Sequence, residues 1–474
     1  MIRIKSLLAG STFLRSAALL AGSTVLGQGL VLLIQPLLTR LYRPEDFGLL
    51  ALYTSILSLL AVVVNLRYEQ AIQLPKEEVE ARSLLALSLL IGIVISLLVG
   101  GIFWFLRDTF AKWFGITLPG FFILLLVLGL ICVAIMQAGS MWALRMAQFR
   151  ALAQTKLQQG IWQAVGQVAL AVFKGPTGLL LGDVLGRLGG VQVLLRLLPG
   201  FVGLSIQTLW NTARRYQSFL FFGAGAALFT AASFHLPFIL LTAHFGTAAM
   251  GQFSLSYRIT TIPVTLVAQS IGQVFFFRAA AVRASTNLAK LTEQTAAALF
   301  MLGLPIFGSL FVVAPQVFPQ IFGNNWAEAG IYAQLLAPYL LLSFVAQPLS
   351  HLLTVREWQK MLFVFTAFEL LLRLGAIFWG VSTQQMYWAV VLFSTSSALI
   401  AALSLMLFFR AAGARWVVFW SRVAPITVAN SLLLLLLWFA SQHISGWNLL
   451  ALTVLSTGTA LLCTGMGWRQ EGLR

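Results

Sequence analysis

Charged residues are scarce in this chain of 474 residues. Asp, Glu, Lys and Arg together make up 9% of it, whereas globular domains average about 25%. Hydrophobic residues make up 59%, and the mean hydropathy is +0.92. A water-soluble fold could not bury so much apolar surface, so lipid must solvate most of the chain. Backbone polar groups in lipid must bond to one another, which leaves helices or closed barrels.

Cysteine is nearly absent, and the chain lacks both a metal-binding acid pair and a long connection between its apolar stretches. The two cysteines, Cys132 and Cys463, lie inside apolar stretches without a metal-ligand neighbour, so neither a disulfide framework nor a metal site is predicted. Asp-x-Asp does not occur, and no connection between apolar stretches is long enough to fold as a soluble domain. A glycan polymerase or glycosyltransferase needs one of these features, so the chain is not predicted to be an enzyme.

The apolar stretches that fill the chain do not alternate with polar residues, which argues against a transmembrane barrel. Each is about 20 residues long, the length that spans a hydrocarbon core of about 30 Å. The sequence therefore predicts an all-α polytopic membrane protein with about fourteen transmembrane helices. They are expected at residues 17–39, 47–66, 83–105, 120–144, 159–173, 177–198, 217–241, 250–276, 294–319, 328–354, 361–381, 384–409, 423–440 and 447–467.

Basic residues outnumber acidic ones by 30 to 13, and their distribution predicts the orientation. With fourteen spans, 22 of the Lys and Arg residues fall on one side, 5 on the other and 3 within spans. Cytoplasmic loops carry the excess of basic residues, so both termini are expected in the cytoplasm and no nucleic-acid partner is predicted. The first apolar run continues to Leu38, which favours an uncleaved helix over a signal peptide.

An internal repeat suggests how the helices are grouped. A proline late in one span and a glycine then a tyrosine at the start of the next recur in the two halves of the chain, at Pro36, Gly48 and Tyr53 and at Pro237, Gly251 and Tyr257. This predicts two six-helix lobes, residues 1–200 and 214–410, related by an axis along the membrane normal. Two further helices within 416–474 would be additions, and the basic stretch from Pro199 to Arg215 would link the lobes.

Ionisable residues at membrane depth are costly and mark candidate functional sites. Asp183 and Arg187 lie four residues apart in one span, and Glu369 and Arg373 repeat this spacing in another. Each pair either neutralises itself within its helix or lines a polar cavity, where the acids are candidates for proton or sodium coupling. Arg258 has no carboxylate three or four residues away. It either extends to the headgroups or binds an anion, and a guanidinium suits a phosphate.

Two further patterns carry expectations about packing and exposure. Gly178, Gly182, Gly186 and Gly190 form a small-residue stripe in the span of Asp183, which predicts close contact with a neighbouring helix. Four glutamates follow the second span together with Lys76 and Arg82 and are interpreted as part of a solvated cytoplasmic turn; they are Glu69, Glu77, Glu78 and Glu80.

Two segments carry a family resemblance. The first, Leu38 to Pro75, reads Leu-Thr-Arg-Leu-Tyr-Arg-Pro-Glu-Asp-Phe-Gly and later Leu-Arg-Tyr-Glu-Gln-Ala-Ile-Gln-Leu-Pro; the second, Gly251 to Arg278, contains Ser-Tyr-Arg, Ile-Pro and Gln-Ser-Ile-Gly-Gln-Val-Phe-Phe-Phe-Arg. They resemble bacterial polysaccharide and O-antigen unit flippases of the multidrug/oligosaccharidyl-lipid/polysaccharide (MOP) exporter superfamily.

The resemblance implies two lobes around a central cavity, alternating access and a multi-pass location in the bacterial inner membrane. It implies that the substrate is an undecaprenyl-diphosphate-linked oligosaccharide, flipped from the cytoplasmic to the periplasmic leaflet, with membrane lipid and possible polymerase or chain-length proteins as partners. Arg40 and Arg258 hold the matching motif positions, and Arg187 and Arg373 join them as substrate-binding candidates because of their depth. No cofactor is expected beyond possible Na⁺ or H⁺ coupling through Asp183 and Glu369.

The alternative is an ion-coupled multidrug or cation antiporter of the same superfamily. Such a protein needs a surplus of buried acids to attract its cargo. The intramembrane residues are three arginines and two carboxylates, a net charge of +1. This balance favours an anionic substrate.

Overall fold

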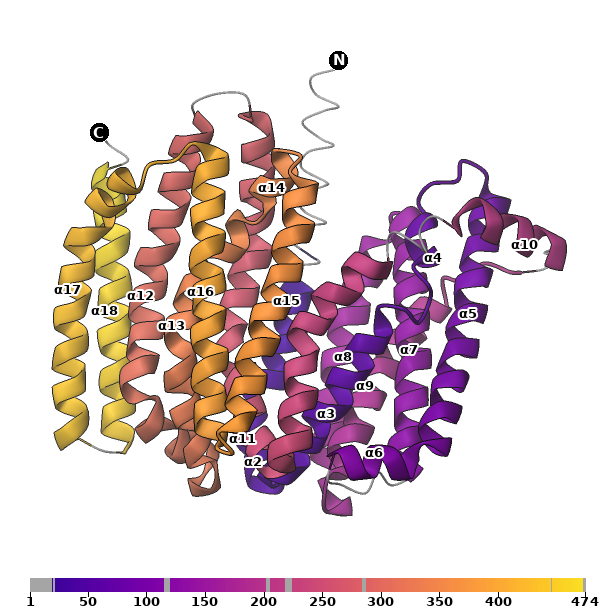
Figure 1. The fold of residues 1–474 in the computed structure, drawn as a ribbon, viewed down its shortest axis with the longest axis horizontal. Coiled ribbons are helices and arrows are strands. Elements are labelled where there is room, and N and C mark those ends of the chain that lie inside the picture. The colour runs from indigo at the N-terminus through magenta and orange to yellow at the C-terminus, as the bar shows by residue number, and fades with distance from the viewer. Residues whose placement is uncertain are drawn as a thin grey trace. The chain divides into compact units, whose positions relative to one another are not determined.

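The computed structural model describes residue 19 and residues 22–114, 120–201, 205–217, 224–283, 287–444 and 446–471. Throughout these ranges the regular structure is helical (Figure 1), which confirms the all-α prediction. A search of the same ranges finds ten helices that are long and apolar enough to cross a membrane. One of them, Ala227–Ala281, has 55 residues, far more than the roughly 20 that one crossing needs. The number fourteen therefore stays a prediction.

The chain forms two compact units, one ending at Met250 and the other beginning at Gly251. The boundary lies inside α11 (Ala224–Ala281), where Gly246 leaves the helical conformation with φ 80° and ψ 174°. Glycine has no Cβ and adopts such angles without strain. Two helices therefore lie on either side of Gly246, as the predicted spans 217–241 and 250–276 require, and the break between them is shorter than the predicted gap. The predicted lobes and the pair of additional helices stay predictions.

The first unit is built around α7, α8 and α9, with α5 packed on α7 and α3 contacting both α7 and α9. The short helices α10 and α6 lie near opposite ends of α5 (Figure 1). The helices before α11 are Gly22–Leu41, which includes α2 (Gln35–Leu41), then α3 (Pro44–Ala61), α4 (Tyr68–Ala71), α5 (Glu78–Phe105), α6 (Arg107–Phe114), α7 (Gly120–Arg145), α8 (Phe149–Ala169), η1 (Leu170–Phe173), α9 (Thr177–Leu195) and α10 (Ile206–Arg215).

Glycines allow backbones to touch in this unit. Gly27 in the first helix and Gly160 in α8 face each other so closely that a Cβ added to Gly160 would collide with the backbone of Gly27. A Cβ on Gly27 would lie 2.6 Å from the carbonyl oxygen of Lys156. Small residues at such crossings let dispersion contacts form along the backbone, which drives helix association in lipid.

The segment between α3 and α5 is buried at Glu69, which corrects the expectation that all four of its glutamates are solvated. Glu69, in α4, is only 4% exposed. The Arg145 guanidinium at the end of α7 donates hydrogen bonds to the carbonyls of Ile72 and Pro75 at 2.9 and 2.7 Å. Tyr68 donates to the carbonyl of Ala213 in α10 at 3.1 Å. These tertiary contacts draw the segment into the protein, whereas Glu77 and Glu78 are exposed as expected.

The second unit is organised around α12, which packs against α13, α17 and α18. On its other side α13 packs on α16, and α16 packs on α15. After α11, its helices are α12 (Asn287–Phe322), η3 (Asn324–Trp326), α13 (Ala327–Leu349), α14 (His351–Val355), α15 (Gln359–Ser382), α16 (Met386–Ala412), α17 (Trp416–His443) and α18 (Trp447–Glu471).

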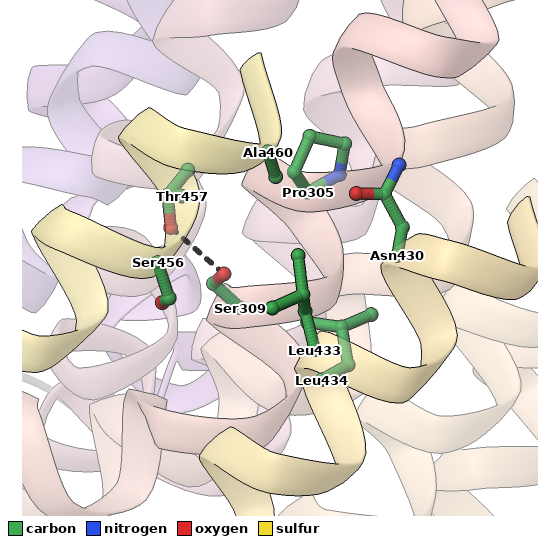
Figure 2. Close-up of a pocket in the computed structure, with 8 residues that line it drawn as sticks. All are labelled: Pro305, Ser309, Asn430, Leu433, Leu434, Ser456, Thr457 and Ala460. Carbon is green, nitrogen blue, oxygen red and sulfur yellow. Dashed lines mark hydrogen bonds between the residues drawn. The ribbon is translucent and has the colours of Figure 1, made fainter. Parts of the chain in front are cut away.

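A small cavity lies between α12, α17 and α18 (Figure 2). Ser309 and Thr457 share a hydrogen bond of 2.9 Å at its wall. Asn430, which is 3% exposed, also lines it. Its lining consists of hydroxyl, amide and apolar groups, so the cavity carries no titratable or charged side chain.

Candidate functional site

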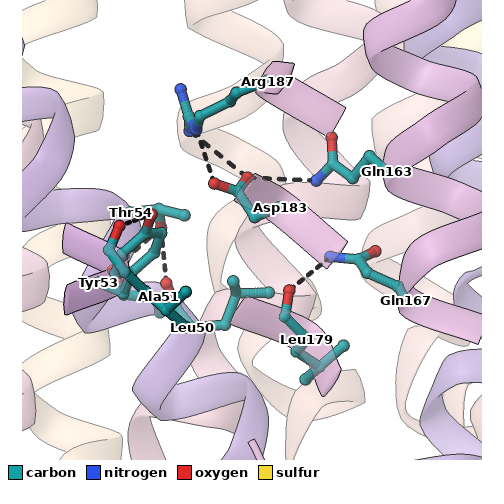
Figure 3. Close-up of polar contacts among 10 residues, drawn as sticks. Leu50, Ala51, Tyr53, Thr54, Gln163, Gln167, Leu179, Asp183 and Arg187 are labelled. Carbon is teal, nitrogen blue, oxygen red and sulfur yellow. Dashed lines mark hydrogen bonds and ion pairs between the residues drawn. The ribbon is translucent and has the colours of Figure 1, made fainter. Parts of the chain in front are cut away.

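The first predicted pair, Asp183 and Arg187, forms a direct ion pair on α9 (Figure 3). Arg187 Nε lies 2.7 Å from Asp183 Oδ2, and Nη2 lies 3.4 Å from Oδ1. The side chains are 8% exposed for Asp183 and 17% exposed for Arg187. Spacing of four residues places both groups on one face of the helix. The two side chains therefore pair within α9, and their predicted role in lining a polar cavity stays a prediction.

The neighbouring helix α8 extends the polar contacts of this pair. Gln163 donates to Asp183 Oδ1 at 3.4 Å, and Gln167, one turn further along, donates to the carbonyl of Leu179 at 3.4 Å (Figure 3). The helices come this close because a Cβ on Gly182 would lie 2.6 Å from the backbone nitrogen of Gln167. The predicted role of the glycine stripe in close helix packing is confirmed.

Two tyrosines that the sequence analysis did not select connect this site to α2 and α3. Tyr42, directly after α2, donates to the backbone carbonyl of Gln167 at 2.7 Å. Tyr53 of α3 is fully buried, donates to the carbonyl of Leu125 in α7 at 3.1 Å and interacts electrostatically with both Asp183 and Arg187. The repeat singled out Tyr53 as a pattern position, but only the tertiary structure shows it beside the ion pair.

The second predicted pair, Glu369 and Arg373, also forms an ion pair within its own helix. Arg373 Nη2 lies 2.9 Å from Glu369 Oε1 on α15, and the Arg373 side chain is only 3% exposed. Its guanidinium carbon lies 5.6 Å from the centre of the Phe393 ring on α16. An arginine over an aromatic face gains a cation–π attraction, which is stronger away from water. Carboxylate and ring together hold this buried charge.

Phe393 is itself the centre of an aromatic cluster. Its ring centre lies 5.6 Å from that of Phe253, 6.3 Å from that of Tyr257 and 6.4 Å from that of Tyr339. Tyr257 interacts electrostatically with both Arg373 and Glu369. The cluster thus joins α11, α13 and α16 around the Arg373 side chain. Sequence spacing alone could not bring these helices together, so this part of the site was missed.

The other two candidate arginines are Arg40 and Arg258. Arg40 is exposed in the last turn of α2, and Arg258 is partly buried in α11, next to Tyr257. The structure thus brings the candidates together as two separate pairs, one in each unit. Contact of the four arginines with one substrate stays a prediction, as does ion coupling through the two acids. No cluster of three His, Cys, Asp or Glu residues that could hold a metal is found in the described part of the chain.

Comparison with known proteins identifies the family. The polysaccharide biosynthesis protein family matches residues 37–331, more than half of the chain. The chain belongs to this family. The succinoglycan biosynthesis transport protein ExoT of Rhizobium meliloti (strain 1021) is 26% identical over 325 residues, which cover 65% of this chain and 62% of ExoT. The chain therefore spans less than two thirds of the length of this relative.

Solved structures of transporters share the fold. The lipid II flippase MurJ in an inward closed conformation matches with a TM-score of 0.68 at 12% identity, covering 99% of this chain and 100% of MurJ. An inward-facing multidrug resistance MATE family transporter of the MOP superfamily matches with a TM-score of 0.64 at 13% identity, covering 83% of this chain and 94% of that one. This family member therefore has the polytopic helical fold of MOP-superfamily transporters. The proteins it resembles are transporters and flippases rather than enzymes.

Proposed function

We propose that this protein flips undecaprenyl-diphosphate-linked oligosaccharides from the cytoplasmic to the periplasmic leaflet of the bacterial inner membrane by alternating access. Family membership and the transport role named for ExoT support the polysaccharide substrate. The fold shared with a lipid II flippase supports flipping as the activity. The sugar would then be built into O-antigen or another surface polysaccharide, with polymerase or chain-length proteins as partners.

The observation that carries the proposal is the placement of guanidinium groups in membrane-length helices. Arg187 and Arg373 are held in α9 and α15 by one carboxylate each, and Arg258 in α11 adds a further positive charge. A guanidinium can bind a phosphate through two parallel N–H groups, which suits a diphosphate headgroup. In the proposed cycle, the deeper arginines hold the diphosphate during reorientation, and exposed Arg40, which follows the first span on the periplasmic side, meets it last.

Ion coupling would use the acids of the two pairs. If Asp183 or Glu369 binds H⁺ or Na⁺, its arginine is released from the ion pair and can bind the diphosphate. The carboxylate of each pair and the diphosphate of the substrate would thus compete for the same arginine. The second candidate is a multidrug or cation antiporter, the activity of the MATE transporter that shares this fold at a lower TM-score than MurJ. The net positive charge among the intramembrane ionisable residues argues against a cationic cargo.

Substitution of Arg258 tests this function in cells. Arg258→Ala is expected to abolish export of the surface polysaccharide and to make the lipid-linked oligosaccharide accumulate in the inner leaflet, while the protein level stays normal. Arg278→Ala, which removes an exposed arginine from the same helix, is the matched control and is expected to keep export. Undiminished export in Arg258→Ala would show that this arginine has only a packing or headgroup role. Absence of any lipid-linked glycan accumulation on deletion of the whole protein would refute the flippase function itself.

A further inference from the structure

The proposed transport cycle does not involve the buried carboxyl of Glu69. Its side chain is 4% exposed, and Oε2 accepts no hydrogen bond. A buried carboxylate oxygen without a donor is strongly unfavourable, whereas a protonated carboxyl tolerates the same environment. The preceding residues Leu66 and Arg67 both have left-handed backbones, with φ 49° and 65°. Each such residue adds about 1 kcal/mol of strain.

The surrounding contacts prevent the segment from relaxing towards water. Arg145 holds its far end through the carbonyls of Ile72 and Pro75, and Tyr68 is bound to α10 through the carbonyl of Ala213. The side chains of Tyr68 and Ile72 also belong to a buried apolar cluster with α5 and α7. These contacts keep Glu69 buried. Its carboxyl therefore avoids a buried negative charge by binding a proton rather than by moving into water.

Arg67 is the cation that acts on Glu69. With the Gln70 amide turned so that its oxygen faces Arg67, that oxygen accepts hydrogen bonds from the guanidinium at 3.2 and 2.9 Å. Arg67 Nε is buried and has no acceptor. The guanidinium thus donates these hydrogen bonds to a neutral amide, although the Glu69 carboxyl lies two residues further along the chain.

The other charged groups of the packed elements are engaged elsewhere or are exposed. Arg145 of α7 binds the two carbonyls described above, and Lys76 and Glu77 are exposed. Glu80 of α5 pairs with Arg215 of α10 at 2.8 Å, and Glu78 pairs with Arg82 at 2.6 Å. Burial therefore raises the pKa of Glu69, and the opposing effects of its own backbone N–H and of the Arg67 charge lower it less.

We infer that Glu69 binds and releases a proton at the end of the first unit that carries α4 and α10, and that release turns the Arg67 guanidinium from Gln70 to the Glu69 carboxylate. The O–H bond of the carboxyl breaks, the proton passes to water on that side, and Arg67 remains a cation throughout. The movement of Arg67 changes the strained backbone at Leu66 and Arg67 and hence the contact with α10. This inference rests on the proposed function for its purpose, because a proton-driven flippase needs a proton-exchanging group at one face of the membrane.

Infrared titration of the purified full-length protein in lipid tests the proton site without any substrate. The stretching band of protonated carboxyls is followed against pH in the wild type, in Glu69→Gln and in Glu77→Gln, the matched exposed control. Glu69→Gln is expected to remove intensity that titrates above pH 4.5, the ordinary pKa of glutamate, whereas Glu77→Gln is expected to leave that intensity in place. Glutamine keeps the shape of the protonated acid, so the variant is expected to fold.

Two results would overturn the inference. The first is a Glu69 carboxyl that titrates at or below pH 4.5. The second concerns Arg67→Gln. This variant removes the cation that favours the carboxylate, so the Glu69 titration is expected to shift to higher pH. Lys76→Gln is the control and is expected to leave the titration in place. An unchanged midpoint in Arg67→Gln would contradict the proposed exchange of partners. A failure of glycan flipping in cells would leave both titrations intact, so the two proposals fail separately.

Discussion

The two intramembrane arginines that form ion pairs are held differently. Arg373 is closed off by a carboxylate and by the ring of Phe393, and its side chain is 3% exposed. Arg187 has a carboxylate partner as well, but its side chain is 17% exposed. An ion pair in a low-dielectric interior must offset the loss of hydration of both groups. The aromatic ring supplies part of that compensation at Arg373, whereas Arg187 keeps more access to a ligand.

Neutralising the pair at Asp183 separates its structural role from its proposed role in substrate binding. Asp183→Asn or Arg187→Gln alone leaves one buried charge without its partner, which is expected to destabilise the protein by about 3–5 kcal/mol. The double variant removes both charges and is expected to lose much less than the sum of the singles. Thermal unfolding of the purified proteins measures this coupling.

The same double variant tests function. Because it lacks the Arg187 guanidinium, it is expected to fold but to lose polysaccharide export. A stable double variant with wild-type export would restrict the pair to a structural role and would remove Arg187 from the substrate site. The Glu69 titration described above should be unaffected in this variant, since α9 contributes no group to that cluster.

At the scale of the helix, the glycine stripe of α9 sets how close α8 can approach. Gly182→Ala places a methyl group 2.6 Å from the backbone nitrogen of Gln167, so the helices must separate and the contact of Gln163 with Asp183 must lengthen. We expect a destabilisation of about 1–3 kcal/mol, as for overpacking in a core. Thermal unfolding measures it.

Gly375→Ala is the matched control for this substitution. Gly375 lies within α15, and a Cβ there would meet no atom within 4 Å. Alanine favours the helix over glycine by about 1 kcal/mol, so the control is expected to be neutral or slightly stabilising. Equal effects of the two substitutions would show that close contact between α8 and α9 contributes little to stability.

Sequence patterns within one helix predicted the structure well. The spacing of Asp183 and Arg187, the same spacing at Glu369 and Arg373, and the stripe of glycines all depend on local geometry, which 3.6 residues per turn determines. Tyr42 and Phe393 were not predicted as partners, because their contacts join helices far apart in the chain. Such contacts follow from the packing of the whole unit.

One expectation failed and another changed in detail, for two different physical reasons. Glu69 sits among charged residues and was interpreted as solvated, yet the carbonyl contacts of Arg145 and the packing on α10 bury it. The loop expected between 241 and 250 is replaced by a single residue, Gly246, because glycine can break a helix without a connecting segment. In both places a tertiary contact or one special backbone angle overrides what composition suggests.

At the scale of the whole molecule, the basic residues and the number of crossings are linked. A division of 22 against 5 Lys and Arg residues arises only if every span alternates direction. One missed or extra crossing in the middle would exchange the sides of all later loops. The long helix α11 is the critical element, since Ala227–Ala281 must cross twice, with the break at Gly246, for the count to hold.

Single cysteines on either side of α11 test this topology in intact cells. After the two native cysteines are replaced, a membrane-impermeant maleimide is expected to label Asp108→Cys and Gln384→Cys from outside, because both positions are exposed and lie on the side with few basic residues. Glu77→Cys and Glu357→Cys, on the basic side, should react only after the membrane is permeabilised. If Asp108→Cys and Gln384→Cys reacted from opposite sides, the number of crossings between them would be odd, whereas the fourteen-span scheme requires an even number, and α11 would not cross twice. Labelling of all four in the inverse pattern would instead keep the fourteen crossings and place both termini outside the cytoplasm.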